Sequence, residues 1–342
     1  MQRRALPEER SQPQQIDSSP RPVASRAPSF GAVVLNWNSA RETMECVEAL
    51  ERADTPPDHV VVVDNGSEDD SVERLEVWAD EHWIWRLSTG TSGRSSTEHT
   101  PWLVIARAGA NRGFAGGSNV GIRYLAQRTT VSHFVLLNSG TTIVPDFLVE
   151  IGRAIERNRL AGLLSGTIFE DPQRDRVWYA GGVAHSLRPL VRHKYDVPES
   201  SEAAPTDFIT GCAMVISRTL LDRIGLLAEC YFPECWEDRE YSLRARNAGF
   251  AVLYVPKATV YRRPPEAMTQ GVGPALHQCR NRLGVFYVRR NYRGLRKAAA
   301  LTYLAVTKPG RALVETVKGH PKSGWAILRG TIEGFVSPAA KR

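Results

Sequence analysis

Short apolar runs alternate with amphipathic stretches through the first half of the chain. The runs are continuous and rich in Val, Leu and Ile, which is typical of strands buried on both faces, and they cover residues 31–36, 58–64, 102–106 and 132–137. Stretches with apolar residues at helical spacing lie between or after them, at residues 40–52, 118–127 and 145–158. This alternation predicts an α/β fold with a mostly parallel central sheet and helices on both faces, whereas residues 160–290 show a mixed pattern.

Polar residues end the predicted strands. Asn36 and Asp64 close the first two runs, Asn111 comes soon after the third, and Asn138 follows the fourth. Parallel sheets bind ligands at the carboxyl ends of their strands, so this placement predicts a polar site. Asp64 could accept hydrogen bonds from a base or a ribose, or it could belong to an ordinary Asx turn. Ser67 is predicted to cap the helix that follows.

Residues 111–119 form a glycine-rich segment, Asn-Arg-Gly-Phe-Ala-Gly-Gly-Ser-Asn. Its three glycines would let the backbone approach a ligand, and a helix predicted from Ser118 would offer an N-terminus that favours phosphate. Arg112 adds positive charge. The glycine spacing differs from that of a dinucleotide-binding fingerprint, and a plain glycine-rich turn is the alternative interpretation.

Residues 236–240, Trp-Glu-Asp-Arg-Glu, place three carboxylates ahead of a basic amphipathic stretch. Acidic side chains in a first helical turn are favoured by the helix dipole. A carboxylate here could also act as a general base. The local pattern leaves both interpretations open.

The charge balance predicts anionic partners. The 342 residues carry a formal net charge of +7, which suits nucleic acid, acidic lipid or a phosphorylated substrate. Nucleic acid is disfavoured because no aromatic residues are interleaved with the basic ones. No run reaches the ~20 apolar residues that span a bilayer, and the first residues contain no apolar segment. We therefore expect a cytoplasmic protein that can associate peripherally with the inner face of the plasma membrane.

The order of the motifs resembles that of the family 2 inverting glycosyltransferases of the GT-A fold, particularly their rhamnosyltransferase-like branch. The resemblance covers about residues 30–292. It rests on seven segments in the same order: Leu-Asn-Trp-Asn at 35–38, Val-Asp-Asn-Gly-Ser at 63–67, the glycine-rich segment at 111–119, Leu-Leu-Asn at 136–138, Thr-Gly-Cys-Ala-Met-Val-Ile at 210–216, Trp-Glu-Asp at 236–238 and Tyr-Val-Pro at 254–256.

The resemblance implies a role for each matching residue. The nucleoside pocket would contain Asn36, Asn38, Asp64 and Asn65. The diphosphate and donor sugar would lie beside Arg112, Gly113, Gly116 and Asn119. The acceptor side would be bordered by Thr210 and Gly211. The substrate-binding set would be completed by Asn138, Trp236, Glu237 and Arg262. Asp238 would be the catalytic base that takes the proton of the acceptor hydroxyl.

The chain departs from the family pattern where a divalent metal is usually bound. Gly140 replaces the usual aspartate, and Arg262 replaces the usual histidine. The leaving diphosphate still needs its charge stabilised, and Arg262 or its neighbour Arg263 could supply that cation. Mg²⁺ or Mn²⁺ held by other carboxylates, such as Glu237, Asp238 or Glu240, is the alternative; no metal ligand is assigned.

The expected function is transfer of a sugar, with inversion, from a nucleotide-diphospho-sugar such as deoxythymidine-diphospho-rhamnose to a cell-surface glycan or a lipid-linked acceptor. The alternative is a catalytically degenerate relative that binds a nucleotide, a glycan or a partner protein. No nucleic acid is expected as a partner.

The resemblance and the composition together imply a domain layout. Residues 1–28 are rich in Pro, Ser, Gln and Arg and are predicted to be a disordered arm. Residues 29–290 would form the GT-A-like domain, with a nucleotide-binding half at 29–158 and an acceptor half at 159–290. Residues 291–342 would be a basic helical extension. Leu301, Leu304, Ala305 and Val306 could form an apolar stripe there that binds an anionic membrane, or the helix could pack on the main domain.

Overall fold

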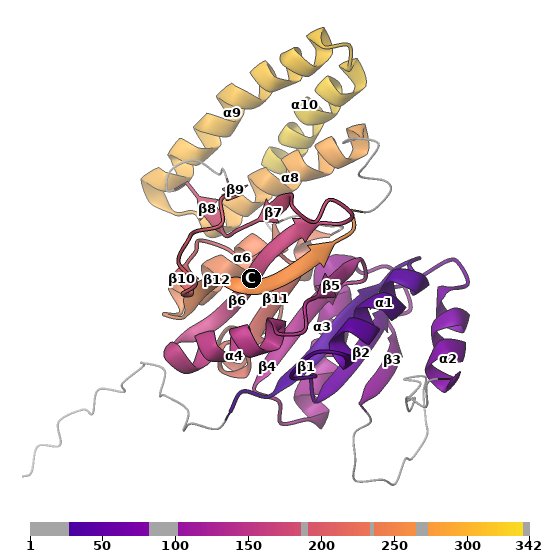
Figure 1. Cartoon of the computed structure of the whole chain (residues 1–342). Helices are drawn as coiled ribbons and strands as arrows, with labels where there is room; N and C mark the ends of the chain where they lie inside the picture. Colours follow the sequence, from indigo (N-terminus) through magenta and orange to yellow (C-terminus); the bar gives the residue numbers. More distant parts are fainter. Residues whose placement is uncertain (1–26, 82–101, 186–190, 233–235, 265–272, 338–342) are drawn as a thin grey trace, which may run out of the picture.

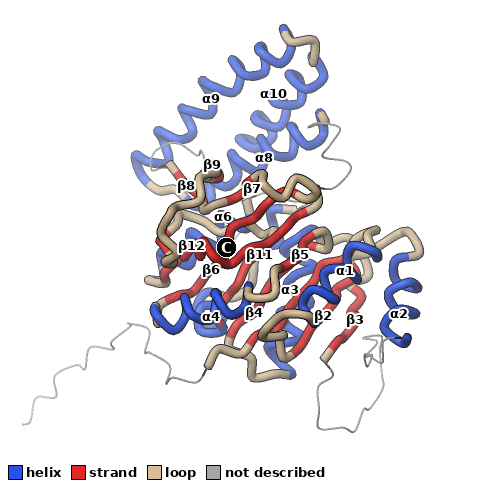
Figure 2. Tube along the Cα trace, in the orientation of Figure 1, coloured by secondary structure: helices blue, strands red, loops and turns tan. Residues whose placement is uncertain are grey.

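The computed structural model describes residues 27–81, 102–185, 191–232, 236–264 and 273–337 (Figures 1 and 2). A central sheet carries helices on both faces, and a group of three helices projects from one end of it. The predicted N-terminal arm, apart from residues 27 and 28, lies outside the described residues, as does the Ser- and Thr-rich segment at 87–100.

The first half of the chain builds a parallel sheet. Its strands are β1 (Phe30–Asn36), β2 (His59–Asp64), β3 (Leu103–Arg107) and β4 (His133–Asn138). They lie in the order β3-β2-β1-β4, with parallel pairing throughout. Each strand begins within two residues of its predicted start, which confirms the interpretation of the apolar runs.

The second half extends the same sheet with mixed pairing, as expected. Antiparallel β11 (Ala213–Ser217) joins β4 to β6 (Ala161–Glu170), and β6 pairs in parallel with β12 (Ala251–Arg262). Shorter strands pair with these: β5 (Thr141–Ile143), β7 (Val177–Tyr179) and β10 (Ala204–Pro205). A separate two-stranded hairpin contains β8 (Gly182–Ala184) and β9 (Val191–His193). The two predicted halves therefore share one continuous sheet.

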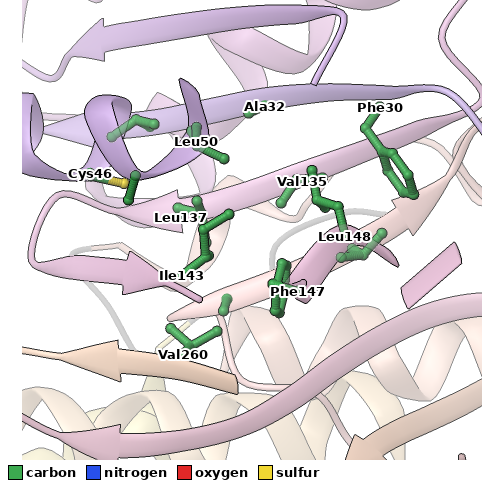
Figure 3. Close-up of a cluster of buried hydrophobic side chains, with 14 of the residues drawn as sticks. Phe30, Ala32, Cys46, Leu50, Val135, Leu137, Ile143, Phe147, Leu148 and Val260 are labelled. Carbon is green, nitrogen blue, oxygen red and sulfur yellow. The ribbon is translucent and has the colours of Figure 1, made fainter. Parts of the chain in front are cut away.

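Side chains of each central strand alternate between two hydrophobic cores. In β1, Ala32 and Val34 face one core and Val33 faces the other. Figure 3 shows the first core, with Ala32, Leu50 and Phe147 labelled. It is covered by α1 (Ala40–Glu51), α2 (Ser71–Glu81) and α4 (Phe147–Arg157). The second core is covered by α3 (Gly113–Arg128), α5 (Arg218–Ile224) and α6 (Glu237–Asn247). Helices on both faces are thereby confirmed.

The glycine-rich segment is the start of a helix, so its interpretation as a loop is wrong. Helix α3 begins at Gly113, five residues before the predicted start. A Cβ atom at Gly117 would come within 2.4 Å of a Leu35 methyl, and one at Gly121 within 2.5 Å of a Val33 methyl. These glycines therefore let α3 pack closely on β1, which offsets their low helix propensity.

Three helices end the described chain, and the last two confirm the helical extension predicted for residues 291–342, whereas the first lies in the segment predicted to belong to the main domain. They are α8 (Pro274–Asn291), α9 (Gly294–Val317) and α10 (Pro321–Val336). A Cβ atom at Gly330 would clash with the Gln278 backbone in α8, and one at Gly324 would clash with Thr316 in α9, so α10 packs closely on both helices. None of the described helices is long and apolar enough to cross a membrane.

The buried imidazole of His133 makes a testable contribution to stability. Burial lowers the pKa of His133 from 6.5 to about 4. Protonation of His133 is therefore easier in the unfolded chain than in the folded one. The contribution of the neutral ring to the free energy of unfolding is fully present above pH 6.5 and is lost as the pH falls toward 4. The shift corresponds to about 3 kcal/mol. We expect the free energy of unfolding of His133→Gln to fall less than that of the wild type over this pH range, as measured by urea denaturation. Parallel curves for the two proteins would contradict this.

Candidate active site

The carboxyl ends of the parallel strands bring three predicted residues together. Asn36 in β1 is in register with Asp64 in β2, and Leu35 is in register with Asn138 in β4. The structure therefore brings these three strand-end residues together, as the pattern predicts. Asn36 and Asp64 are buried, whereas Asn138 is exposed.

A hydrogen-bond network fixes the Asp64 carboxylate. The Asn36 side-chain amide donates to Asp64 Oδ1 at 3.0 Å and to Ser67 Oγ at 3.1 Å, and the Ser67 hydroxyl donates to Asp64 Oδ1 at 2.5 Å. Ser67 thus belongs to the site network. Its predicted role as a helix cap is wrong, because α2 begins only at Ser71. Asn36 also accepts a hydrogen bond from Thr43, so its buried side chain orients Asp64.

Trp37 comes directly after Asn36, at the end of β1. Its side chain is 53% exposed, although it follows the fully buried Asn36. The next residue, Asn38, is exposed and has a positive φ of 50°; its side-chain oxygen accepts a hydrogen bond from the Glu68 amide at 2.8 Å. Sequence reasoning named the two asparagines and missed the tryptophan between them. An aromatic residue directly after a strand end was the available signal.

Asn65 ties the end of β2 to the start of α3. Its amide group donates to the Gly113 carbonyl at 3.2 Å and to Asn111 Oδ1 at 3.3 Å, and its oxygen accepts from the Arg112 amide at 3.1 Å. Arg112 is exposed, and its Nε donates to the Ala108 carbonyl at 3.0 Å. Asn65 thereby positions the α3 N-terminus and Arg112 next to the strand edge.

Asn119 and Gly116 lie deeper in α3. The buried Asn119 side chain donates to the Leu227 carbonyl and to Glu229 Oε1 and accepts from the Leu227 amide, so it fastens α3 to the segment before α6. A Cβ atom at Gly116 would lie 2.5 Å from Arg112 Cβ. Gly116 therefore packs against Arg112. Both hydrogen-bond donations from the Asn119 side-chain amide go to other residues of the protein.

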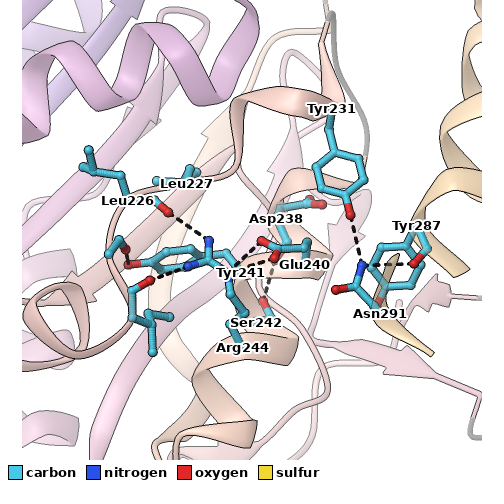
Figure 4. Close-up of polar contacts among 12 residues, drawn as sticks. Leu226, Leu227, Tyr231, Asp238, Glu240, Tyr241, Ser242, Arg244, Tyr287 and Asn291 are labelled. Atoms are coloured by element: carbon cyan, nitrogen blue, oxygen red, sulfur yellow. Dashed lines mark hydrogen bonds and ion pairs between the residues drawn. The ribbon is translucent and has the colours of Figure 1, made fainter. Parts of the chain in front are cut away.

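The turn after β4 lacks the chemistry of a divalent-metal site. Gly140 has no side chain, and its carbonyl accepts a hydrogen bond from the Arg263 amide at 2.7 Å. Glu240, one of the alternative ligands, is buried and bonded at 2.8 and 2.9 Å to Arg244, which also donates to the carbonyls of Leu226 and Ile224 (Figure 4). Among the described residues, no three His, Cys, Asp or Glu side chains gather to hold a metal ion. The residues at these positions do not fit the usual metal site.

Asp238 lies in the first turn of α6 and reaches toward the strand edge. Its Oδ2 accepts a hydrogen bond from the Gly211 amide at 3.3 Å. The next carbonyl, that of Cys212, accepts from the Asn138 amide at 3.3 Å, and a Cβ atom at Gly211 would lie 2.7 Å from the Phe114 ring of α3. The segment at 210–212 therefore joins Asp238 to β4 and to the start of α3. Thr210 is buried and accepts from the Cys212 amide at 3.4 Å.

Trp236 and Glu237 shape the entrance to α6. Trp236 has a left-handed backbone conformation with φ of 89°; its ring stacks 4.9 Å from that of Tyr287 and touches Gly284 in α8. Glu237 is buried beside it. Trp236 thus anchors the Asp238 turn on the C-terminal helices.

Arg262 is a buried cation at the end of β12. Its side chain is 9% exposed and lies 3.9 Å above the Trp178 ring. Within the described part of the chain, its guanidinium forms no ion pair and no hydrogen bond. Burial of a cation is costly unless other groups compensate it, and the Trp178 ring is the compensating group among the described residues.

The neighbouring Arg263 faces a different set of residues, because successive strand side chains alternate between faces. It forms ion pairs with Glu45 at 3.1 Å and Asp171 at 3.3 Å. These acidic partners raise the pKa of Arg263. The structure therefore distinguishes the two candidates: Arg263 is held in ion pairs, whereas Arg262 forms none with the described residues.

His193 lies close to Trp178, the residue that Arg262 contacts, and sequence reasoning did not single it out. Its ring packs edge-on against Trp178 and Tyr179, with centroids 4.6 and 5.2 Å apart. Burial lowers the pKa of His193, and the charges of Arg239, Asp238 and Arg262 also act on it. Short strands without periodicity carry these residues, so the sequence offered no signal for them.

Comparison with known proteins gives the site its context. The family model described as "Glycosyltransferase like family 2" matches residues 27–273. A search of curated protein sequences found no match.

Solved structures share the fold at low sequence identity. GalNAc-T7 with UDP, GalNAc and Mn²⁺ is 14% identical, with a TM-score of 0.58 over 77% of this chain and 48% of that one. The mannosyltransferase PcManGT from Pyrobaculum calidifontis, in complex with GDP-Man and Mn²⁺, is 15% identical, with a TM-score of 0.53 over 94% and 90%. TarS 1–349 from S. aureus is 16% identical, with a TM-score of 0.51 over 89% and 81%.

These likenesses confirm the GT-A-like α/β fold. The lengths of the matched proteins differ. The chain spans about half of the GalNAc-T7 chain, 48% of its length. It spans 43% of the chain in a second S. aureus TarS structure.

Proposed function

Because the chain belongs to the glycosyltransferase-like family 2, we propose that it transfers a sugar from a nucleotide-diphospho-sugar to a hydroxyl acceptor, with inversion at the anomeric carbon. One observation carries the proposal. The segment at 210–212 holds the Asp238 carboxylate beside the strand edge that bears Asp64 and Asn138. A base and a donor site therefore share one surface.

The donor nucleoside is proposed to bind between Trp37 and Asp64. The exposed Trp37 ring offers a flat apolar surface for a base, and the Asp64 carboxylate can accept hydrogen bonds from a base N–H or a ribose hydroxyl. Asn36 and Ser67 hold that carboxylate in place. Asn65 then fixes Arg112 and the α3 N-terminus where the diphosphate would follow.

The chemical step is a single displacement. The acceptor oxygen attacks the anomeric carbon as its proton passes to Asp238, and the bond from that carbon to the diphosphate oxygen breaks on the opposite face. The nucleoside diphosphate leaves with its electron pair. Arg262 is proposed to stabilise the negative charge that develops there, because its buried guanidinium has no ion pair among the described residues.

The finer assignments follow from the resemblance of the motifs. We propose a deoxythymidine-diphospho-rhamnose-like hexose donor and a cell-surface glycan or lipid-linked acceptor, with transfer at the cytoplasmic side of the plasma membrane. Asp238 and the Asp64 network support an active transferase over a purely nucleotide-binding relative.

A nucleotide-release assay tests the function. The protein is incubated with single nucleotide-sugar donors and an extract of lipid-linked or polysaccharide acceptors, with and without EDTA. We expect acceptor-dependent release of one nucleoside diphosphate, retained in EDTA. Binding of a nucleotide without release from any donor would instead favour the degenerate binding protein.

Removal of the Asp64 carboxylate is expected to weaken nucleotide binding. Asp64→Ala loses a charged hydrogen-bond acceptor, and such a bond contributes about 1.5–3 kcal/mol. Isothermal titration calorimetry with the nucleoside diphosphate measures the loss. The control is Asp54→Ala, which changes an exposed aspartate in the loop before β2, at the opposite edge of the sheet. Equal affinities for the two folded variants would remove Asp64 from the nucleotide site.

A further inference from the structure

Helix α9 carries an exposed apolar stripe that the hydrophobic cores do not use. Its side chains are Leu295, Val306, Leu313 and Val317; Leu295 is 90% and Val317 80% exposed. Successive members are 11, 7 and 4 residues apart, and these spacings place them along one line of an α-helix. The line runs nearly the whole length of α9.

This stripe differs from the one predicted from sequence. Leu304 is buried and Leu301 half-buried, and both belong to a cluster with Phe286 and Tyr287 of α8. Val306 alone belongs to both sets. The predicted stripe is therefore partly the inner face of α9, so its assignment to a membrane is wrong for Leu301 and Leu304.

Helix α10 repeats the arrangement. Its inner face contains Gly324, Gly330 and Gly334, which allow close contact with α9 and α8. Its outward side chains are Trp325, Ile332 and Val336, spaced 7 and 4 residues apart and 59–74% exposed. Small residues thus pack inside the helical group, and large apolar residues face outward.

The charge of the chain is concentrated in the same segment. From Arg289 to the last residue there are twelve Lys or Arg and two Glu, whereas residues 1–288 have 32 Lys or Arg and 35 Asp or Glu. The positive balance of the protein therefore resides in the segment from Arg289 onward. Exposed cations lie in α9 at Arg296 and Arg311 and directly beside its ends at Arg293 and Lys318.

We propose that α9 and α10 form a docking surface for an anionic lipid bilayer, with the α9 stripe entering the interface between headgroups and acyl chains. Charge selects this occupant. A second copy of the chain would bring two positively charged segments together, whereas acidic headgroups complement that charge. The described helices cannot span a membrane, so α9 would lie along the surface. This inference is independent of the proposed glycosyl transfer.

Vesicle flotation with the full chain tests the docking surface. The probes are phosphatidylcholine vesicles with and without phosphatidylglycerol. We expect binding to the anionic vesicles that weakens with added salt. The triple variant Val306→Glu, Leu313→Glu and Val317→Glu is expected to reduce that binding at least ~10-fold, because it places carboxylates where apolar side chains enter.

A matched triple variant separates insertion from net charge. Val77→Glu, Leu160→Glu and Val197→Glu also replace exposed apolar side chains, which are 57%, 43% and 42% exposed, but outside the C-terminal helices. It lowers the net charge equally and is expected to keep most of the binding. Equal loss in the two triple variants would overturn the proposal.

Two further measurements keep the outcome decisive. Circular dichroism and thermal melting should show that both triple variants remain folded, because all six side chains are exposed. Light scattering after size-exclusion chromatography reports the oligomeric state. A wild-type dimer that the α9 variant converts to a monomer, with vesicle binding unchanged, would assign the stripe to a second copy of the chain and overturn the proposal.

Discussion

Replacing Asp238 by asparagine is expected to lower the turnover of sugar transfer by at least ~100-fold, the usual scale for the loss of a positioned general base. Asparagine keeps the size of the side chain and can still accept the hydrogen bond from the Gly211 amide. It cannot take a proton from the acceptor hydroxyl. Steady-state kinetics with saturating donor and acceptor measure the change, and nucleotide affinity by calorimetry should stay close to that of the wild type.

The control for this variant is Asp222→Asn, an exposed aspartate in α5. It should transfer sugar at the wild-type rate. A full rate for Asp238→Asn in a preparation with proven activity would show that another group takes the proton. A parallel loss of rate and nucleotide affinity would instead place Asp238 in donor binding.

The parallel strands and the strand-end residues could be predicted because their signal is local. Val-rich runs that end in Asn36 or Asp64 specify both a buried strand and the edge where its polar end emerges. Parallel pairing then sets these ends in register. The adjacency of Asn36 and Asp64 follows from the pattern and elementary sheet geometry alone.

Contacts between distant segments could not be predicted. The low helix propensity of glycine argued for a loop at 113–117, but the benefit of packing α3 on Val33 and Leu35 outweighs that cost. Ser67 has a capping side chain, yet Asp64 and Asn36 compete successfully for its hydroxyl. The partner of Arg262 is Trp178, 84 positions earlier in a three-residue strand, so no local pattern links them.

The same tertiary view changes the interpretation of the missing metal ligands. Sequence alone favoured Arg262 as the compensating cation and kept Arg263 as the alternative. Arg263 is neutralised by Glu45 and Asp171, whereas Arg262 is buried on the Trp178 ring, which His193 also contacts. Compared with the family pattern that the motifs resemble, Gly140 and Arg262 would both shift local charge in the positive direction, which is the direction that the proposed diphosphate leaving group requires.

Arg262→Ala is therefore expected to weaken nucleoside-diphosphate binding by about 10-fold or more, whereas EDTA should leave wild-type binding nearly unchanged. A charged hydrogen bond to phosphate contributes about 1.5–3 kcal/mol, which corresponds to this range. Arg263→Ala is the matched control, since it removes the same charge one residue further along and should alter affinity little. Calorimetry with and without EDTA measures the nucleoside-diphosphate affinity of the wild type, Arg262→Ala and Arg263→Ala.

A stricter test rebuilds the usual metal ligands. The double variant Gly140→Asp with Arg262→His restores a carboxylate and an imidazole, and it should bind nucleoside diphosphate more tightly with Mn²⁺ than without it. A Cβ atom at position 140 would lie 3.0 Å from the Arg263 carbonyl oxygen, so the turn must yield by a few tenths of an ångström. Gly140→Ala makes the same steric demand without a ligand and should show no metal dependence. If the wild type already requires Mn²⁺ or Mg²⁺ for donor binding, then Arg262 does not replace the ion. The ligands of the metal ion would then be sought at Glu237 and Asp238, because Glu240 already forms an ion pair with Arg244.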